Sequence, residues 1–151
     1  MTDSDDLLKL ENQLCFALVT AARNVVAIYR PILEPLGLTH PQYLVMLALW
    51  ERSPRTLNDL AADLAMDPAT ASPLVKRREK DGLIARERSS EDERRLDIRL
   101  SESGRALRRR ALDVPRQVMA AVHMDIQQVT SLRDGLSPFA GRTPIEPAHT
   151  P

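Results

Sequence analysis

The sequence predicts a mainly α-helical protein with a small β-hairpin wing, the arrangement of a winged helix-turn-helix. Three observations predict this fold. Apolar residues recur at steps of three and four over residues 7–32, two short helical patterns flank a turn within residues 56–84, and apolar and charged residues alternate over residues 96–100. The first pattern is typical of a long amphipathic helix, the second of a helix-turn-helix and the third of a strand.

The 151 residues fit one domain, which we assign to residues 1–136. The winged helix-turn-helix covers about 53–100, and helical segments over about 7–36 and 101–136 flank it. Residues 137–151 contain four prolines and are predicted to form a flexible tail.

Two prolines and Gly37 end the first helix, because proline breaks the helical hydrogen-bond ladder and glycine accepts the left-handed backbone of a helix end. The segment 39–41, Thr-His-Pro, opens a second helix over roughly 41–51. Its side chains are apolar nearly all round, which predicts that this helix is buried.

The helix-turn-helix is bounded by capping residues. Thr56 is placed to cap a short helix, and Asp67 to cap a second one that has Pro68 at its first position and ends at Gly82. Pro73 interrupts the second helix, where a lost hydrogen bond costs about 3 kcal/mol. The helix remains in the prediction because departures from local rules concentrate at functional sites.

A charged β-hairpin follows. Ile84 begins one strand, the stretch LDIRL at 96–100 forms the other, and the polar sequence SSEDERR joins them. From a Ser101 cap to about residue 136 the chain is predicted to be helical, with Pro115 as an interruption.

Composition excludes several classes of protein. One cysteine cannot form an intrachain disulfide, and the acidic N-terminus MTDSDD lacks the features of a secretory signal. Uncharged runs fall short of the roughly 20 apolar residues of a membrane span, so we expect a soluble, cytoplasmic protein without membrane contact. His40, His123 and His149 show no metal-ligand spacing, and no cofactor is expected.

The charge of the chain is unevenly distributed. The total is zero, with 21 basic and 21 acidic residues, but residues 76–110 hold 13 basic against 8 acidic side chains, a net charge of +5. A basic middle within a neutral chain indicates a DNA-binding face. The alternative is a solvated, salt-bridged surface.

If residues 68–81 form the recognition helix, its outer face carries hydroxyl and basic side chains, which suit base edges and phosphates in the major groove. Arginines at the tip of the hairpin are placed to reach the adjacent minor groove, where Arg favours narrow A·T tracts. The predicted DNA-binding residues are Thr70, Ser72, Pro73, Lys76, Arg77, Arg86, Asp92, Arg94 and Arg95.

Several motifs resemble the MarR family of bacterial transcription regulators. Asp92-Glu93-Arg94, after KDGLI and before Leu100-Ser101-Glu102-Ser103-Gly104, resembles the wing signature of that family. LKLENQLCFAL, LTHPQYLVMLALWE and ERSSEDERR are similar to its organic-hydroperoxide-sensing repressors, the OhrR group, in their one-cysteine form. The resemblance covers nearly the whole chain.

The resemblance implies an obligate two-fold homodimer, with interlocked first and last helices, on a palindromic double-stranded DNA operator. It implies that the reduced protein represses a peroxidase gene and that oxidation of the cysteine by an organic hydroperoxide releases the DNA. Carried over by position, Cys15 is the sensor, Tyr29 is one of the tyrosines that hold its thiolate, and Asp92 with Arg94 belongs to the wing.

Three positions depart from the family pattern. His40 occupies the position of a second thiolate-binding tyrosine of the family, and Val19 that of a third tyrosine nearby. Arg78 occupies a position that is apolar in the family. For Arg78 two explanations are open, a buried salt bridge and a contact to the DNA backbone.

A lone cysteine on an amphipathic helix is usually a small apolar filler, but the resemblance favours a sensor for Cys15. An ordinary thiol is only about 3% thiolate at neutral pH, so a fast sensor needs its anion stabilised. The middle of a helix offers no dipole for this, and Tyr29 lies about 21 Å away along the same helix. A second copy, packed antiparallel and crossing near Ala22, would bring its Tyr29 to Cys15.

His40 keeps a hydrogen-bond donor and adds titration: if protonated, it would favour the thiolate more strongly than a phenol does. Tyr29 has an alternative role as an ordinary core residue.

Oxidation of Cys15 would give a sulfenic acid, and with no second cysteine the thiol that traps it must be a low-molecular-weight one. We therefore expect a mixed disulfide and no intersubunit disulfide. Two other functions remain open: a MarR-type repressor released by a non-covalent aromatic ligand, and a thiol peroxidase. The missing resolving cysteine and the basic wing disfavour the peroxidase. The expected class is a non-enzyme.

Overall fold

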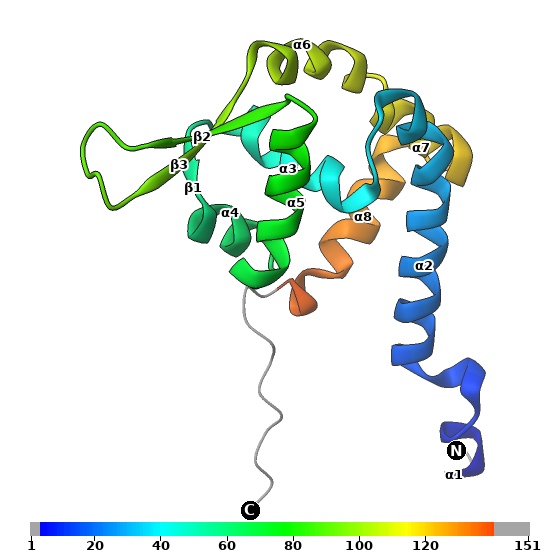
Figure 1. The fold of residues 1–151 in the computed structure, drawn as a ribbon. Helices are drawn as coiled ribbons and strands as arrows, with labels where there is room; N and C mark the ends of the chain where they lie inside the picture. The colour runs from blue at the N-terminus through cyan, green and yellow to red at the C-terminus, as the bar shows by residue number, and fades with distance from the viewer. Residues whose placement is uncertain (1–3, 141–151) are drawn as a thin grey trace, which may run out of the picture.

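A three-stranded antiparallel sheet lies at one edge of a helical body in residues 4–140, which are the residues that the computed structural model describes (Figure 1). The wing hairpin and the N-terminal half of α2 project from opposite sides of this body. The mainly α-helical fold with a β-hairpin wing is therefore confirmed. The helices are α1 (Ser4–Leu7), α2 (Leu14–Leu33), α3 (His40–Glu51), α4 (Leu57–Asp63), α5 (Pro68–Lys80), α6 (Glu102–Ala111), α7 (Val114–Val122) and α8 (Ile126–Gly135), with 3-10 turns η1 (Leu10–Asn12), η2 (Glu34–Leu36) and η3 (Ser137–Phe139), and the strands are β1 (Arg55–Thr56), β2 (Ile84–Arg88) and β3 (Leu96–Leu100).

The prediction of one continuous helix over residues 7–32 is wrong at its N-terminal end. The side chains of Asn12 and Gln13 donate hydrogen bonds of 2.6 and 2.7 Å to main-chain carbonyls six residues earlier. Amide side chains that bond to the backbone compete with the helical ladder, so the chain turns and a new helix starts at Leu14. Cys15 consequently lies in the first turn of α2 rather than in the middle of a helix.

Helix α3 forms the centre of the core, as its uniformly apolar sequence predicts. Thr39 and Gln42 form a capping box at its start, in which the Thr39 N–H donates to Gln42 Oε1 at 2.9 Å. At its other end the Trp50 Nε1–H donates to the Gly104 carbonyl at 2.8 Å and thereby ties α3 to α6. The buried residues of α3 are Tyr43, Val45, Met46, Ala48 and Leu49.

Helices α4 and α5 form the predicted helix-turn-helix. Thr56 Oγ1 accepts a hydrogen bond from the Asp59 N–H at 3.1 Å, which confirms the predicted cap. The Asp67 side chain makes no capping hydrogen bond, although α5 begins at Pro68 as predicted. Pro73 lies inside α5 without ending it.

Both of these helices end in a left-handed residue. Gly82 has φ of 78° after α5, as predicted, whereas Ala65 takes φ of 53° after α4. The Met66 N–H donates to the Ala61 carbonyl at 3.0 Å and the Ala65 N–H to the Ala62 carbonyl at 3.2 Å, the two bonds of a Schellman motif. Left-handed backbone costs an alanine about 1–2 kcal/mol, so this turn is strained.

The predicted hairpin is formed by β2 and β3, which pair antiparallel with Ile84 opposite Leu100 and Arg88 opposite Leu96. A third strand, β1, pairs with the other edge of β3 and gives the order β1-β3-β2. The sequence did not predict β1, because two residues are too few to show alternation.

The C-terminal part contains three helices. Ser101 Oγ accepts a hydrogen bond from the Gly104 N–H at 3.0 Å, so the predicted cap is confirmed. Pro115 lies in the first turn of α7, and a second break, which the sequence did not predict, occurs where His123 takes φ of 55° between α7 and α8. Of the predicted tail, η3 is a short helix, and residues 141–151 lie outside the described residues.

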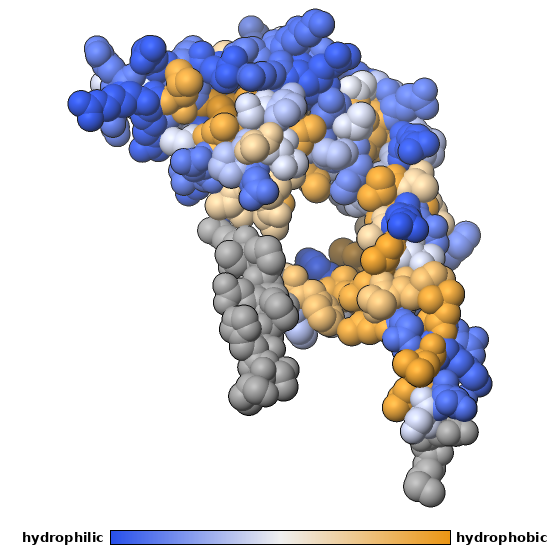
Figure 2. All heavy atoms as spheres, turned by 60° about the horizontal axis from the view of Figure 1, so that its bottom comes forward, coloured by the Kyte–Doolittle hydropathy of each residue, from blue (hydrophilic) through white to orange (hydrophobic). Residues whose placement is uncertain are grey.

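Large apolar side chains remain uncovered on the helices near both ends of the described chain. Figure 2 shows this apolar surface along the helices on the side away from the wing tip. By length and composition Leu14–Leu36 is apolar enough to cross a membrane, contrary to the sequence-based expectation, and 6% of its most apolar 18-residue window is buried. The exposed residues of this set include Leu8, Leu10, Leu14, Phe16, Val19, Ile126, Leu132 and Phe139.

Candidate nucleic-acid interface and candidate thiol site

Helix α5 presents one polar face to solvent and one apolar face to the core. Ala71 and Val75 are buried against the core, and Leu74 is half-buried, as the helical period predicts. The outer face agrees with the predicted DNA-binding surface of this helix: Thr70, Pro73, Lys76 and Arg77 are exposed, and Ser72 is half-buried.

Asp92 shapes the tip of the wing. Its Oδ1 accepts a hydrogen bond from the Arg94 N–H at 3.0 Å, and its main-chain carbonyl accepts one from the Arg95 N–H at 3.0 Å. An aspartate that bonds to the backbone two residues on fixes a tight turn. The turn leaves the Arg94 side chain exposed at the end of the hairpin, while Arg95 pairs with a carboxylate of β3 at 3.5 Å.

An ion pair links the recognition helix to the wing. Arg86 on β2 donates two hydrogen bonds to the Glu79 carboxylate of α5, at 3.1 and 3.0 Å. These hydrogen bonds lower the pKa of Glu79 and raise that of Arg86. The bidentate geometry restricts the relative position of the two elements. The Glu79 carboxylate also offsets the charge of Arg86, whose contact with DNA stays a prediction.

Arg78 points away from the exposed face of α5. Its side chain is 2% exposed, and its Nη2 lies 2.6 Å from the Asp81 carboxylate. Of the two explanations that the sequence left open, the buried salt bridge is therefore correct.

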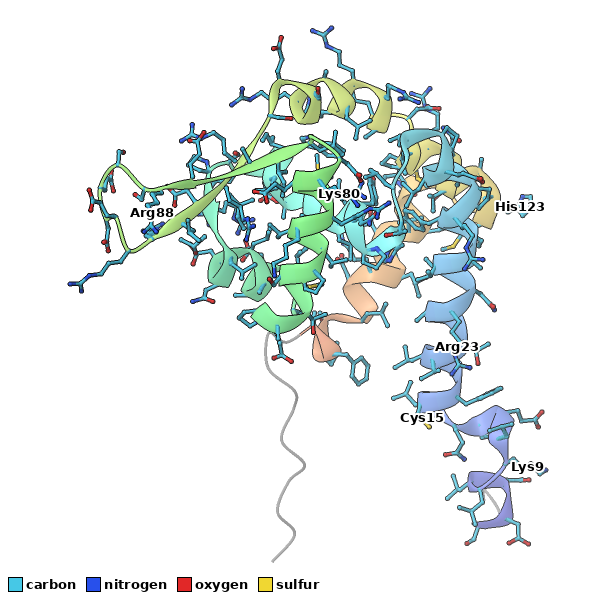
Figure 3. All side chains as sticks on the ribbon, viewed as in Figure 1. Lys9, Cys15, Arg23, Lys80, Arg88 and His123 are labelled. Atoms are coloured by element: carbon cyan, nitrogen blue, oxygen red, sulfur yellow. The ribbon has the colours of Figure 1, made fainter. Side chains whose placement is uncertain are left out.

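Two further arginines of the wing are Arg88 on β2 and Arg99 on β3, and Arg99 pairs with Glu87 at 3.3 Å. Arg88, labelled in Figure 3, donates from Nη1 to the Glu93 carbonyl across the loop at 2.7 Å. Its position at the end of β2 is the signal that could have identified it as a brace of the wing loop.

Cys15 is exposed near the free end of α2, away from the winged helix-turn-helix (Figure 3). The first turn of a helix carries main-chain N–H groups that have no helical partner, and these favour an anion. The expectation that Cys15 lies far from a helix dipole end is thus wrong. It assumed a helix that begins at residue 7, whereas α2 begins at Leu14 and places Cys15 at its positive N-terminal end. Phe16 and Val19, close to Cys15 in the first turns of α2, are exposed apolar side chains.

Tyr29 and His40 come together in one protomer, as an aromatic pair whose ring centroids lie 5.2 Å apart in an edge-to-face contact. Tyr43, which the sequence analysis did not single out, packs beside them with its ring centroid 5.9 Å from that of Tyr29. Its position three residues after His40 on a buried helix is the signal that could have found it. Cys15 is not part of this cluster, because it lies about 21 Å from Tyr29 along α2.

Burial sets the protonation of this cluster. It lowers the pKa of His40 and raises the pKa values of Tyr29 and Tyr43. Burial therefore favours the uncharged form of all three side chains, and the hypothesis of a protonated His40 that attracts a thiolate stays a prediction. Each of the three remains able to donate a hydrogen bond.

A cleft of about 800 Å³ lies next to His40, between α2, the start of α3 and the C-terminal end of α5. Its volume is within the range of small-molecule sites, and its lining includes Arg30, Arg77 and Arg78 together with Glu34 and Asp81. Among the described residues no group of three or more His, Cys, Asp or Glu side chains is arranged to hold a metal ion.

Comparisons with known proteins agree with this geometry. Residues 27–110 match the family model of the transcriptional regulators SarA and Rot. The chain is 39% identical over 136 residues to the organic hydroperoxide resistance transcriptional regulator of Bacillus subtilis, covering 90% of this chain and 92% of the relative.

Solved structures of regulators on DNA have the same fold. Reduced AbfR bound to DNA superposes with a TM-score of 0.73 and 30% sequence identity, over 91% of this chain and 96% of that one. The transcriptional repressor CouR on a 23-mer DNA duplex superposes with a TM-score of 0.80 and 25% identity, over 89% of this chain and 96% of that one.

Proposed function

Since the chain belongs to the MarR/SarA family of winged-helix transcription regulators that bind DNA, we propose that it is a repressor that releases its operator when Cys15 is oxidised by an organic hydroperoxide. The proposal includes a two-fold homodimer, a palindromic operator and a cytoplasmic location. The observation that carries it is the distance along α2 between Cys15 and Tyr29, whose ring contacts that of His40 on α3.

A dimer accounts for this separation. If two copies of α2 pack antiparallel and cross near Ala22, Cys15 of each copy comes to the Tyr29–His40 pair of the other, because residue 22 is midway between residues 15 and 29. The same packing would cover the apolar surface of α2, whose contiguous exposure is unusual for a monomer. A second copy is therefore our preferred occupant of this surface rather than a membrane.

The chemistry needs one thiol from the protein. The Cys15 thiolate attacks the terminal oxygen of the hydroperoxide, the O–O bond breaks, and the alkoxide leaves as an alcohol after it takes up a proton. The first-turn N–H groups of α2, with Tyr29 and His40 of a second copy, would stabilise the thiolate. A low-molecular-weight thiol then attacks the sulfenic sulfur, which forms a mixed disulfide and releases water.

A structural neighbour has been solved in several oxidation states, and its overoxidised form is still bound to DNA, so the proposal assigns release to the disulfide-level product. AbfR has been solved reduced on DNA, overoxidised on DNA and with a disulfide formed. This chain has one cysteine, so the corresponding product here would be the mixed disulfide.

The test is fluorescence anisotropy on a duplex that the wild-type protein selects from a random pool, before and after stoichiometric cumene hydroperoxide with a small thiol. The wild type is expected to bind and then to dissociate, while Cys15→Ser remains bound. Intact-mass analysis should show one mixed disulfide per chain. A covalent dimer, or equal release of wild type and Cys15→Ser, would contradict the proposal.

The competing function within the family is release by a non-covalent aromatic ligand, for which the cleft beside His40 offers space. CouR of Rhodococcus jostii has been solved with p-coumaroyl-CoA bound. Release that persists in Cys15→Ser would favour this function. We propose that the protein is not an enzyme, and many turnovers of peroxide per thiol would show a thiol peroxidase instead.

A further inference from the structure

Arg78 connects the recognition helix to the turn that follows the long helix α2. It lies near the C-terminal end of α5, where its Nη2 pairs with Asp81 at 2.6 Å. Its Nη1 donates to the carbonyl of Gly37 at 3.3 Å, and Gly37 stands 41 residues earlier in the chain, directly after η2. One side chain thus bonds both to α5 and to the segment that joins α2 to α3.

This guanidinium is not placed to contact DNA. Its side chain is 2% exposed, whereas the neighbouring Lys76 and Arg77 are exposed on the outer face of the helix. Burial lowers the pKa of Arg78, and its buried Nε has no hydrogen-bond partner in the described part of the chain. A buried cation with incomplete partners is a weak source of stability, because an apolar side chain of similar size often serves as well.

A cation kept at such a position is better explained by the geometry that it imposes. The guanidinium is planar, and its two Nη atoms bond in fixed directions to a carboxylate and a carbonyl on different segments. The angle between α5 and the end of α2 is then restricted by directional bonds in addition to the apolar core that contains Leu33 of α2 and Val75 of α5.

We infer that Arg78 is a positioning residue for DNA binding: it holds the recognition helix at its DNA-reading angle relative to the end of α2. The inference rests on the proposed function in one respect: it takes oxidation of Cys15, at the other end of α2, as the signal. A displacement of α2 after oxidation would reach α5 through Gly37 and Arg78.

Arg78→Met tests the inference, with Arg77→Met as the matched control. Methionine fills much of the same space, and the remaining Asp81 carboxylate is 34% exposed, so water can solvate it and the variant should fold. For Arg78→Met we expect the Kd of the reduced protein on the selected duplex to rise about tenfold. The slope of log K against log salt should stay as in the wild type, because no phosphate contact is lost.

Arg77→Met should behave differently, since its arginine is exposed on the predicted DNA face. Loss of one phosphate contact from each protomer of the proposed dimer would make the salt slope shallower by about 1.8. If Arg78→Met also shows a shallower slope, Arg78 contacts DNA and the inference is wrong. If Arg78→Met lowers the melting temperature but binds within twofold of the wild type, the arginine has only a structural role and the inference is equally wrong.

A second arm measures the ratio of the oxidised to the reduced Kd. In the wild type this ratio is large if the proposed function holds, and in Arg78→Met it should fall about tenfold while Cys15 is oxidised to the same extent by mass. A wild type that does not respond to peroxide defeats the proposed function, whereas the reduced-state comparison still decides the role of Arg78. If Arg78→Met does not fold, Asp81→Asn replaces it as the test variant. For Asp81→Asn we expect a smaller rise in Kd and a salt slope equal to that of the wild type. A Kd equal to that of the wild type would overturn the inference.

Discussion

Gly104 is the position where a single methyl group should do the most damage. A Cβ added there would lie 2.1 Å from the main-chain oxygen of Leu83, and a backbone carbonyl cannot swing aside as a side chain can. The same carbonyl accepts a hydrogen bond from the Ser101 N–H at 3.0 Å, and the Gly104 carbonyl accepts one from Trp50 at 2.8 Å. Gly104 thus lies where the start of β2, the start of α6 and the end of α3 meet.

The size of the effect follows from these distances. Ordinary contact begins at 3.4 Å, so α6 must move by about 1.3 Å to accommodate Gly104→Ala. A shift of that size weakens both hydrogen bonds, at about 1 kcal/mol each, and adds about 1–3 kcal/mol of overpacking. The better helix propensity of alanine returns about 1 kcal/mol. The net loss of unfolding free energy is about 3 kcal/mol, which corresponds to a melting temperature lower by about 6–12 °C.

Thermal unfolding followed by circular dichroism measures this change, and Gly135→Ala is the matched control. Gly135 ends α8, and a Cβ there meets nothing within 4 Å, so its melting temperature should equal or slightly exceed that of the wild type. If Gly104→Ala melts within about 2 °C of the wild type, the close approach of α6 to Leu83 is not as tight as described.

Three further predictions concern the turn, the cap and the buried histidine. Ala65→Gly removes the left-handed strain after α4 and should raise the unfolding free energy by about 1 kcal/mol in urea titrations; an unchanged or lower value would show that the turn is not strained. Thr56→Ala leaves the Asp59 N–H without its cap and should lower the unfolding free energy by about 1 kcal/mol, whereas Thr56→Ser should keep most of it. His40 has a depressed pKa in the folded protein, so the unfolded chain takes up its proton first as pH falls through about 6.5. The His40 contribution to the unfolding free energy should therefore be complete above that pH and decline below it. Urea titrations at several pH values should show a smaller decline for His40→Gln than for the wild type. An equal decline in both proteins would assign the effect to other groups.

Elements with a strong local signal could be predicted from the sequence. Helix α3 has an uninterrupted apolar run, α5 has a proline at its first position and Gly82 after its end, and β3 alternates cleanly, so each was placed within a residue or two. The outward face of α5 followed from the helical period alone, so four of the five side chains predicted to face outward on this helix are exposed, and their contact with DNA stays a prediction.

Features that depend on contacts between distant residues could not be predicted. The break before α2 arises because Asn12 and Gln13 donate to main-chain carbonyls six residues earlier, a contact that the sequence alone does not indicate. The role of Arg78 depends on Gly37, which is far from it in the sequence. The proximity of Tyr29 and His40 depends on the angle between α2 and α3, which no periodicity in the sequence specifies.

The ion pair between Glu79 and Arg86 has a consequence for the length of DNA that the protein reads. It joins the helix that we predict to enter the major groove to the strand that leads to the wing tip, so the distance between the two predicted DNA-contacting points is restricted within one protomer. One base pair inserted between the two contacted stretches of an operator moves them about 3.4 Å apart along the duplex axis and rotates one against the other. A braced pair of contacts cannot follow that change, and we expect the spacing within each half-site to be more strictly required than the identity of the bases between the contacts.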